Sequence, residues 1–320
     1  MAHCKGTMTG GLTIIFLAGP TAAGKTDLAI SLVDEFSLGL ISVDASQVYR
    51  GLNIGTAKPA PAVLKSYPHA LIDIRNPEEI FSAGAFCRES VQEVHRIVSK
   101  QQIPTLVGGT MFYFAALTDG LGRFPGADPQ FRYDIEAEAR QLGWPALHER
   151  LEALDPVAAQ RIHHNDRQRI QRALEMHSQT GRTVFGSTQE QSRLPYGTRI
   201  IRLGLTFSDR SLLHYRIEQR VDQMLNSGFL AEVGGLLAKG TDPQSPALRS
   251  VGYRQACQYL NNELDYSEMR QRMIFATRQF AKRQLTWMRN TPGTVWFDAA
   301  DRDISQTVGS YLKTCLADQN

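Results

Sequence analysis

Short apolar runs alternate with amphipathic stretches in the first third of the chain. Leu12–Ala18 is apolar and β-branched and stops at a glycine, which predicts a buried strand. Lys25–Phe36 then gathers its apolar residues on one face of a predicted helix. Further strands are predicted at Leu40–Val43 and Ile103–Val107, and Ser82 is a candidate N-cap for a helix between them. Strands and helices that alternate in this way indicate a parallel sheet covered by helices on both faces.

The pattern changes near the middle of the chain. Gly122–Pro129 is rich in turn residues and predicts a domain boundary. From Phe131 to about Thr180 the periodicity is helical, and a β-like run returns only at Thr198–Phe207. Three helices and a closing strand are predicted after that run, at Asp209–Asn226, Phe229–Lys239, Tyr266–Arg289 and Thr294–Phe297.

These patterns divide the chain into a core and an insert. We expect residues 11–125 and 196–320 to form an α/β core with C-terminal helices, interrupted by an all-helical domain of residues 126–195. A length of 320 residues, with 42% hydrophobic and 21% charged residues, suffices for one large or two modest globular domains. The composition therefore favours a folded protein over general disorder.

Cysteine usage and hydropathy bear on the compartment. The 4 cysteines lie far apart and form no Cys-x-x-Cys pair, which excludes a zinc site of that kind and favours reduced thiols in a cytosol. The apolar runs Leu12–Ala18 and Ile103–Leu117 are too short or too interrupted to span a bilayer. We expect a soluble, cytoplasmic protein with no membrane partner. The net charge of +3 is too small to identify a partner.

A phosphate-binding loop follows the first predicted strand. The spacing of glycine, lysine and threonine is a full Walker A match, with a strand before it and a helix after it as the motif requires. Backbone N–H groups and the helix N-terminus form an anion cradle, Lys25 adds a charge, and the Thr26 hydroxyl is a candidate ligand for Mg²⁺. The core is therefore predicted to be P-loop NTPase-like. The loop residues are Gly19, Pro20, Thr21, Ala22, Ala23, Gly24, Lys25 and Thr26.

The usual occupant of such a loop is a nucleoside triphosphate. Enzymes that bind one usually place a magnesium-binding aspartate at the end of a second apolar strand, and here that aspartate is not on the expected strand. The strand Ile103–Val107 ends in Gly108-Gly109-Thr110 and carries no carboxylate, whereas Asp44 follows Leu40–Val43. A carboxylate at the end of a parallel strand lies at the edge of the sheet that carries the phosphate loop. Asp44 is therefore a candidate proton acceptor or Mg²⁺ ligand, and the alternative is that it only caps the next turn.

Two segments concentrate basic residues. The segment Arg161–Arg172 has one acid, and Arg249–Arg289 interleaves its cations with Tyr253, Tyr259, Phe280 and Trp287. Cations with stacking side chains suit a nucleic-acid backbone and an unstacked base. A solvated basic helix face explains the charge equally well, so charge alone leaves both interpretations open.

An ordered series of motifs resembles one family, the tRNA dimethylallyltransferases. The resemblance covers about residues 12–298 and is specific because the motifs occur together and in the family's order. The matching segments are Gly19–Thr26, Ile41–Tyr49, Asn53–Pro59, Val107–Thr110, Asn165–Glu175, Arg216–Arg220, Val251–Arg254 and Lys282–Arg289.

The resemblance implies a reaction and a set of catalytic residues. Family members transfer the dimethylallyl group of dimethylallyl diphosphate to N6 of the adenine at position 37, next to the anticodon of tRNA. The phosphate loop would then hold diphosphate with Mg²⁺ rather than ATP, and Asp44 would be the general base. Lys25, Thr26 and Arg220 would complete the catalytic set. The implied partners are a tRNA anticodon stem-loop and the prenyl diphosphate, bound by a monomer.

The resemblance also implies an RNA-contact set. Two positions depart from the family pattern: Ala45 and Gln47 stand where relatives often have Ser and Leu or Ile, which affects the details of adenine contact. The implied tRNA contacts are Asp44, Ala45, Ser46, Gln47, Thr110, Arg132, Gln168, Arg169, Ile170, Gln171, Arg172, Arg249, Ser250, Val251, Gly252, Tyr253, Arg254, Lys282, Arg283, Gln284, Leu285, Thr286, Trp287, Met288 and Arg289.

Two other functions share some of these features. An ATP-dependent small-molecule kinase would use the same loop and fold, but the strand before Gly108 lacks its usual carboxylate. A nucleotide-gated RNA-binding protein without catalysis would leave Asp44 without a role. Prenyl transfer to bulk tRNA separates all three hypotheses.

Overall fold

The computed structural model describes residues 11–122, 125–183 and 193–317, and the chain forms two compact units. One unit consists of Met1–Leu117 with Arg193–Asn320, and the other is Thr118–Ser192. The insert expected at residues 126–195 begins and ends a few residues later than the second unit. Residues 123–124 of the predicted boundary segment and residues 184–192 lie outside the described ranges.

A six-stranded sheet forms the centre of the first unit. Its order is β3-β2-β4-β1-β5-β6, and every neighbouring pair is parallel, which confirms the predicted α/β core. Ala18 pairs with Gly108, and Val43 also pairs with Gly108, so the carboxyl ends of β1, β2 and β4 lie level. The strands are β1 (Thr13–Ala18), β2 (Leu38–Val43), β3 (His69–Ala70), β4 (Ile103–Gly108), β5 (Arg199–Thr206) and β6 (Thr294–Asp298).

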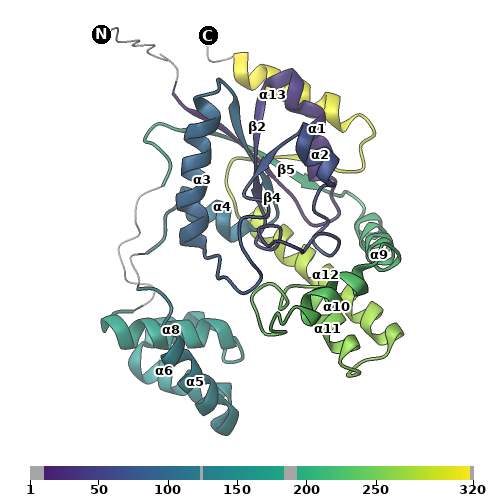
Figure 1. The fold of residues 1–320 in the computed structure, drawn as a ribbon. Coiled ribbons are helices and arrows are strands. Elements are labelled where there is room, and N and C mark those ends of the chain that lie inside the picture. Colours follow the sequence, from purple (N-terminus) through teal and green to yellow (C-terminus); the bar gives the residue numbers. More distant parts are fainter. Residues whose placement is uncertain (1–10, 123–124, 184–192, 318–320) are drawn as a thin grey trace, which may run out of the picture. The chain divides into compact units, whose positions relative to one another are not determined.

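Alternate residues of each strand face opposite helical layers. Ile15 and Leu17 belong to the core formed with α1 (Lys25–Phe36) and α13 (Ile304–Ala317). Phe16 faces the other way, toward Phe114 of α4 (Met111–Thr118), with 4.9 Å between the ring centroids. The same face is covered by α3 (Ala83–Val98), whose predicted cap Ser82 accepts a hydrogen bond from the Ala85 N–H. Figure 1 shows α3 on one side of the sheet and α1 and α13 on the other.

Four more helices complete the carboxyl side of this unit. The bounds of α9, α10 and α12 were predicted to within two residues. The fourth helix, α11, was not predicted, and neither were the short elements α2 and β3, because they are too short to show a clear period. The helix α13 was not predicted either. The remaining bounds are α2 (Pro61–Ser66), α9 (Arg210–Asn226), α10 (Phe229–Ala238), α11 (Tyr253–Leu260) and α12 (Tyr266–Arg289).

The described part of the second unit contains four helices joined by short non-helical segments, as the periodicity predicted. Buried Ile135, Leu147, Leu151, Ile170 and Leu174 belong to a core of its own. Aspartate side chains cap three of its helices, which fixes where each helix begins. The helices are α5 (Pro129–Leu142), α6 (Trp144–Leu154), α7 (Pro156–Arg161) and α8 (Arg167–Thr180).

A buried carboxylate organises one end of this helical unit. Glu175 has no exposed surface, and its Oε1 accepts hydrogen bonds from Arg132 Nε at 2.8 Å and from the Asp128 N–H at 2.7 Å. Its Oε2 accepts from Arg132 Nη2 at 2.9 Å and from Arg172 Nη1. Two of the expected RNA-contact arginines are therefore also structural partners of Glu175.

Across the described residues, no helix is both long and apolar enough to cross a membrane. Cys87, Cys257 and Cys315 carry free thiols, and Cys4 lies outside the described ranges. The thiols agree with the expectation of reduced cysteines.

Removing the buried carboxylate should destabilise the helical unit. Glu175→Ala leaves Arg132 and Arg172 without their buried partner, so we expect the free energy of unfolding to fall by on the order of 3 kcal/mol. Chemical denaturation, followed by Trp144 fluorescence in a variant whose other tryptophans are Phe, measures this. Glu138→Ala breaks only the partly exposed pair with Arg150 and should cost less than about 1 kcal/mol.

The same carboxylate gives the stability a defined pH dependence. Burial alone would raise the pKa of Glu175, but hydrogen bonds from Arg132 and Arg172 lower it to about 2. Because the folded-state pKa is depressed, the stabilisation is complete above the ordinary value of 4.5 and is lost as the pH falls toward 2. Equal losses for Glu175→Ala and Glu138→Ala would contradict this assignment.

Candidate functional site

A large pocket lies at the carboxyl edge of the sheet in the first unit. Its volume is about 1340 Å³, enough for a small ligand together with a nucleobase. It collects segments that are far apart in the sequence. Its lining includes Thr21–Asp27, Asp44–Gln47, Gly55–Ala57, Val107–Phe112, Arg220, Arg249–Tyr253, Arg283, Gln284 and Trp287.

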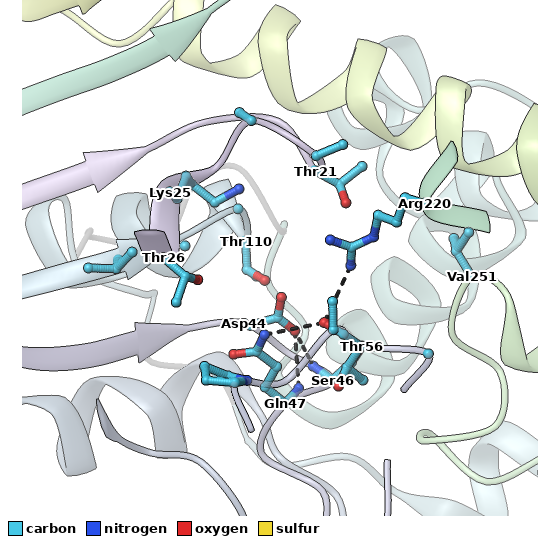
Figure 2. Close-up of a pocket in the computed structure, with 18 of the residues that line it drawn as sticks. Thr21, Lys25, Thr26, Asp44, Ser46, Gln47, Thr56, Thr110, Arg220 and Val251 are labelled. Carbon is cyan, nitrogen blue, oxygen red and sulfur yellow. Dashed lines mark hydrogen bonds between the residues drawn. The ribbon is translucent and has the colours of Figure 1, made fainter. Parts of the chain in front are cut away.

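The phosphate loop forms one wall of this pocket. Gly24 has a left-handed φ of 74° and ends the loop, and α1 begins at Lys25. A φ of this sign suits glycine because it has no Cβ to collide with the backbone. Lys25 Nζ donates to the Pro20 carbonyl at 2.8 Å, and Thr26 stands one residue further along the helix (Figure 2). The predicted anion cradle is thus formed by a strand, a tight loop and a helix N-terminus.

Two cations in the pocket influence each other. Burial and the neighbouring Arg220 lower the pKa of Lys25 to about 8, although the Asp44 charge opposes the shift. Burial also lowers the pKa of Arg220, and Asp44 again opposes this. Figure 2 shows Arg220 entering the pocket from the side opposite Lys25. Two desolvated positive charges around one carboxylate suit a ligand that carries several negative charges.

Asp44 both caps a turn and faces the pocket. Its Oδ1 accepts hydrogen bonds from the Ser46 N–H at 2.8 Å and the Gln47 N–H at 3.1 Å. This oxygen therefore caps the turn that follows β2, as the alternative interpretation of Asp44 predicted. Among the described residues, both hydrogen bonds to the Asp44 carboxylate reach Oδ1 and none reaches Oδ2. Thr110 fixes the same turn, because its Oγ1 accepts from the Ala45 N–H at 3.1 Å.

Gln47, one of the two departures from the family pattern, is held at both ends of its amide. The Ser42 hydroxyl donates to Gln47 Oε1 at 3.0 Å, and Gln47 Nε2 donates to the Thr56 carbonyl at 3.3 Å. Arg220 Nη2 donates to the same carbonyl at 3.4 Å. The Thr56 carbonyl therefore links the turn after Asp44 to the second cation, as Figure 2 shows.

Gln284 of α12 connects the phosphate loop to the turn after β4. Its Oε1 accepts from the Thr21 N–H at 2.9 Å, and its Nε2 donates to the Gly109 carbonyl at 2.8 Å. The side chain is only 5% exposed, and a Cβ on Gly109 would lie 2.3 Å from its Nε2. Sequence reasoning placed Gln284 among the RNA contacts and missed this bracing role, which no local pattern signals.

Apart from the buried Leu285 and Met288, the expected RNA contacts fall into three groups. Ala45, Ser46, Gln47, Thr110, Arg249–Tyr253, Arg283, Gln284 and Trp287 line the pocket with Asp44. Arg254, Lys282, Thr286 and Arg289 are exposed in the same unit but do not line it. Arg132 and Gln168, Arg169, Ile170, Gln171 and Arg172 belong to the helical unit.

Besides Gln284, four members of the expected RNA-contact set have buried side chains. Tyr253 and Ile170 have no exposed surface, and Met288 and Leu285 are 2% and 8% exposed. Each packs inside its own unit, so any contact with RNA would come from its backbone. Conversely, exposed Phe112 lines the pocket with Trp287 at a centroid distance of 6.2 Å, and sequence reasoning missed it.

Comparison with known proteins agrees with the geometry. The family model of the IPP transferases matches residues 47–291. The tRNA dimethylallyltransferase of Thioalkalivibrio sulfidiphilus is 51% identical over 282 residues, which are 87% of this chain and 88% of that protein. The chain belongs to the IPP transferase family. The resemblance inferred from its motifs is thereby confirmed.

Solved structures of IPP transferases share the fold. The tRNA isopentenylpyrophosphate transferase of Bacillus halodurans is 34% identical with a TM-score of 0.70, and 96% of this chain and 97% of that chain are covered. The enzyme of Staphylococcus epidermidis is 29% identical with a TM-score of 0.67, with 96% and 99% covered. A eukaryotic dimethylallyltransferase acting on tRNA is 25% identical with a TM-score of 0.77, with 97% and 81% covered.

The lowered pKa of Lys25 should make diphosphate binding pH-dependent. Free Lys25 loses its proton near pH 8, whereas a bound diphosphate favours the charged form, so binding takes up a proton. The contribution of Lys25 to affinity is complete below pH 8 and is lost as the pH rises above it. Alkyl phosphates lose their last proton near pH ~6, so the ligand itself does not change charge in this range.

Calorimetry of dimethylallyl diphosphate binding without RNA measures this uptake. Titrations in buffers of different ionisation enthalpy should give about half a proton per ligand at pH 8, rising toward one at higher pH. Lys25→Met should bind more weakly and take up none. Equal proton uptake by both proteins would exclude Lys25 as the group that titrates.

Proposed function

We propose that this chain transfers the dimethylallyl group of dimethylallyl diphosphate to N6 of the adenine at position 37 of tRNAs. The observation that carries the proposal is the pocket in which a phosphate loop, Asp44 and Arg220 meet. Membership of the IPP transferase family and a relative named as a tRNA dimethylallyltransferase support the same conclusion. The products are N6-dimethylallyladenosine and diphosphate.

The leaving group is the first part of the mechanism. As the allylic C–O bond breaks, its electron pair stays on the diphosphate and negative charge develops there. The backbone N–H groups of the loop, Lys25 and Arg220 surround that position and stabilise the charge without rearranging. Burial and the neighbouring Arg220 lower the pKa of Lys25, so an anion beside it would favour its charged form.

Mg²⁺ is part of the proposal. The described residues include no cluster of three or more His, Cys, Asp or Glu side chains that could hold a metal on their own. The donors present fit an ion bound mainly by diphosphate oxygens and water, because Mg²⁺ usually keeps such ligands. The Thr26 hydroxyl would hold it from the protein side. When bound, the ion would neutralise charge on the diphosphate.

Asp44 provides the general base for the second part of the mechanism, the attack of the adenine amine on the prenyl carbon. The exocyclic amine of adenine is a weak nucleophile because its lone pair is shared with the ring. As that pair forms the N6–C bond, the amine must lose a proton, and Asp44 Oδ2 accepts it. Because Oδ1 is held by the Ser46 and Gln47 N–H groups, the carboxylate is fixed while Oδ2 stays accessible.

The adenine must leave its stack to reach this pocket. A base inside the anticodon loop cannot approach the prenyl carbon, so it is turned outward into the protein. Thr110 and Arg249–Tyr253 line the pocket with Asp44, and exposed Phe112 and Trp287 offer ring faces near them. The exposed arginines of α8 would add contacts between the helical unit and RNA phosphates.

The kinase alternative is weaker on structural grounds. The strand β4 ends at Gly108, and Gly109 is packed against Gln284, so the usual position of a metal-binding carboxylate is filled by backbone and an amide. Incubation with dimethylallyl diphosphate, Mg²⁺ and bulk tRNA should yield prenylated adenosine. Phosphoryl transfer from ATP to a small acceptor would favour the kinase instead.

Asp44→Asn should separate chemistry from binding. Asparagine keeps the oxygen that caps the turn but cannot accept the proton, so we expect kcat to fall ~10²-fold or more. tRNA affinity, measured by fluorescence anisotropy, should stay near that of the unaltered protein. Single-turnover prenylation with saturating tRNA measures the chemical step, and an undiminished rate would remove Asp44 from the mechanism.

Salt dependence should reveal which arginines of α8 contact phosphates. Arg167 and Arg169 are exposed, so Ala at either position should weaken binding of an anticodon stem-loop and reduce the slope of log K against log salt by ~0.7–0.9. Dimethylallyl diphosphate affinity should not change. Arg172→Ala also breaks the bond to Glu175 and should lower stability as well.

Arg302→Ala is the control for this series, because Arg302 is exposed in the other unit and does not line the pocket. It should leave the salt slope unchanged. If the double variant of Arg167 and Arg169 also keeps the original slope, α8 presents only a solvated basic face.

A further inference from the structure

The loop Asn53–Pro59 belongs to a motif shared with the family, yet none of its residues is in the proposed catalytic set. Its backbone N–H groups converge on a single carboxylate, Glu232 of α10. Glu232 Oε2 accepts from the N–H groups of Asn53 at 2.9 Å and Ile54 at 2.8 Å, and Oε1 accepts from Gly55 at 3.3 Å. Hydrogen bonds to a charged acceptor are stronger than neutral ones, so this contact fixes the loop firmly.

Tyr253 of α11 adds a fourth hydrogen bond to the same carboxylate. Its hydroxyl donates to Glu232 Oε1 at 2.6 Å. Burial and the neighbouring Glu232 raise the pKa of Tyr253, so the hydroxyl keeps its proton and acts as the donor. Gly55 lies directly on the rings, because a Cβ there would be 2.3 Å from Phe229 and 2.5 Å from Tyr253.

The other side of the loop faces the pocket. The Thr56 carbonyl accepts from Arg220 Nη2 and from Gln47 Nε2, and the Thr56 hydroxyl donates to the Leu52 carbonyl at 2.7 Å. Arg220 and Lys25 are like charges in one pocket, and Arg220 destabilises the charged form of Lys25. A fixed acceptor opposite Lys25 is needed to keep the guanidinium aimed into the pocket.

We propose that Glu232 is a positioning residue for the transfer reaction. It holds the Asn53–Pro59 loop so that the Thr56 carbonyl orients Arg220 toward the leaving diphosphate. Glu232 does not line the pocket, so it acts only through the loop. The proposal rests on the proposed function, since it assigns Arg220 to the diphosphate. It also gives Tyr253 a defined role, because the buried hydroxyl joins the RNA-side segment 249–254 to the diphosphate side.

The expected loss is in turnover more than in RNA binding. Displacement of a catalytic group by a fraction of its hydrogen-bond length weakens transition-state stabilisation strongly. Glu232→Ala should lower kcat roughly 10- to 30-fold and leave the KM for tRNA within about twofold. Glu232→Gln keeps one oxygen for the Asn53 and Ile54 N–H groups and should restore kcat to within roughly threefold. Tyr253→Phe should fall between the two.

A double-mutant cycle distinguishes a positioning role of Glu232 from a purely structural one. Arg220→Ala alone removes the group that Glu232 positions, so adding Glu232→Ala should reduce kcat by less than about twofold more. Val233→Ala, a cavity-forming change at a fully buried residue of the same helix, controls for lost stability. It should lower the unfolding temperature but leave kcat near that of the unaltered protein well below that temperature.

The measurement is single-turnover prenylation of an anticodon stem-loop, with dimethylallyl diphosphate affinity determined by calorimetry in parallel. Independent, multiplicative losses for Glu232→Ala and Arg220→Ala would overturn the proposal, as would full activity of folded Glu232→Ala. If the unaltered protein transfers no prenyl group, the proposed function has failed. The same cycle in diphosphate affinity then decides whether Glu232 positions Arg220. If Glu232→Ala does not fold, Glu232→Gln and Tyr253→Phe complete the cycle.

Discussion

Two partly buried cations held near one carboxylate are the constraint on which the rest of the site depends. Burial lowers the pKa of Lys25 and of Arg220, and Asp44 opposes the shift at both. Removing like charges from water costs free energy. Without a bound anion, this cost must be offset by the stability of the surrounding structure. The sheet contributes by bringing the carboxyl ends of β1, β2 and β4 level, so that the phosphate loop and Asp44 share one edge.

The rigidity of this arrangement comes from polar side chains outside the reacting set. Gln284 ties the phosphate loop to the Gly109 turn, and Glu232 ties the Asn53–Pro59 loop to α10 and α11. Both use hydrogen bonds to backbone groups, which specify the path of the chain without depending on neighbouring side chains. The helical unit follows the same principle, with Glu175 holding Arg132 and the start of α5.

Much of the fold could be predicted from the sequence because its signals are local. The Walker A spacing, the apolar strands and the cap Ser82 each occupy a few consecutive residues, and the structure contains the predicted elements. Gln284 and Glu232 could not be assigned in the same way. Their partners lie 263 and 178 positions away, and a lone Gln or Glu in a helical pattern is normally a surface residue. Tyr253 was expected to contact RNA from the family resemblance, and its burial could not be predicted because it depends on packing against the distant Gly55.

The bridge formed by Gln284 has a consequence for how the protein is made. The phosphate loop is synthesised early, but the acceptor of the Thr21 N–H, Gln284 Oε1, lies 263 residues further along the chain. The strand β1 likewise lacks one neighbour until β5 emerges, since Ile15 pairs with Ile201. The loop is therefore held in its final form only after residue 284 has been synthesised. A nascent or prematurely terminated chain carries the entire Walker A sequence without a finished binding site.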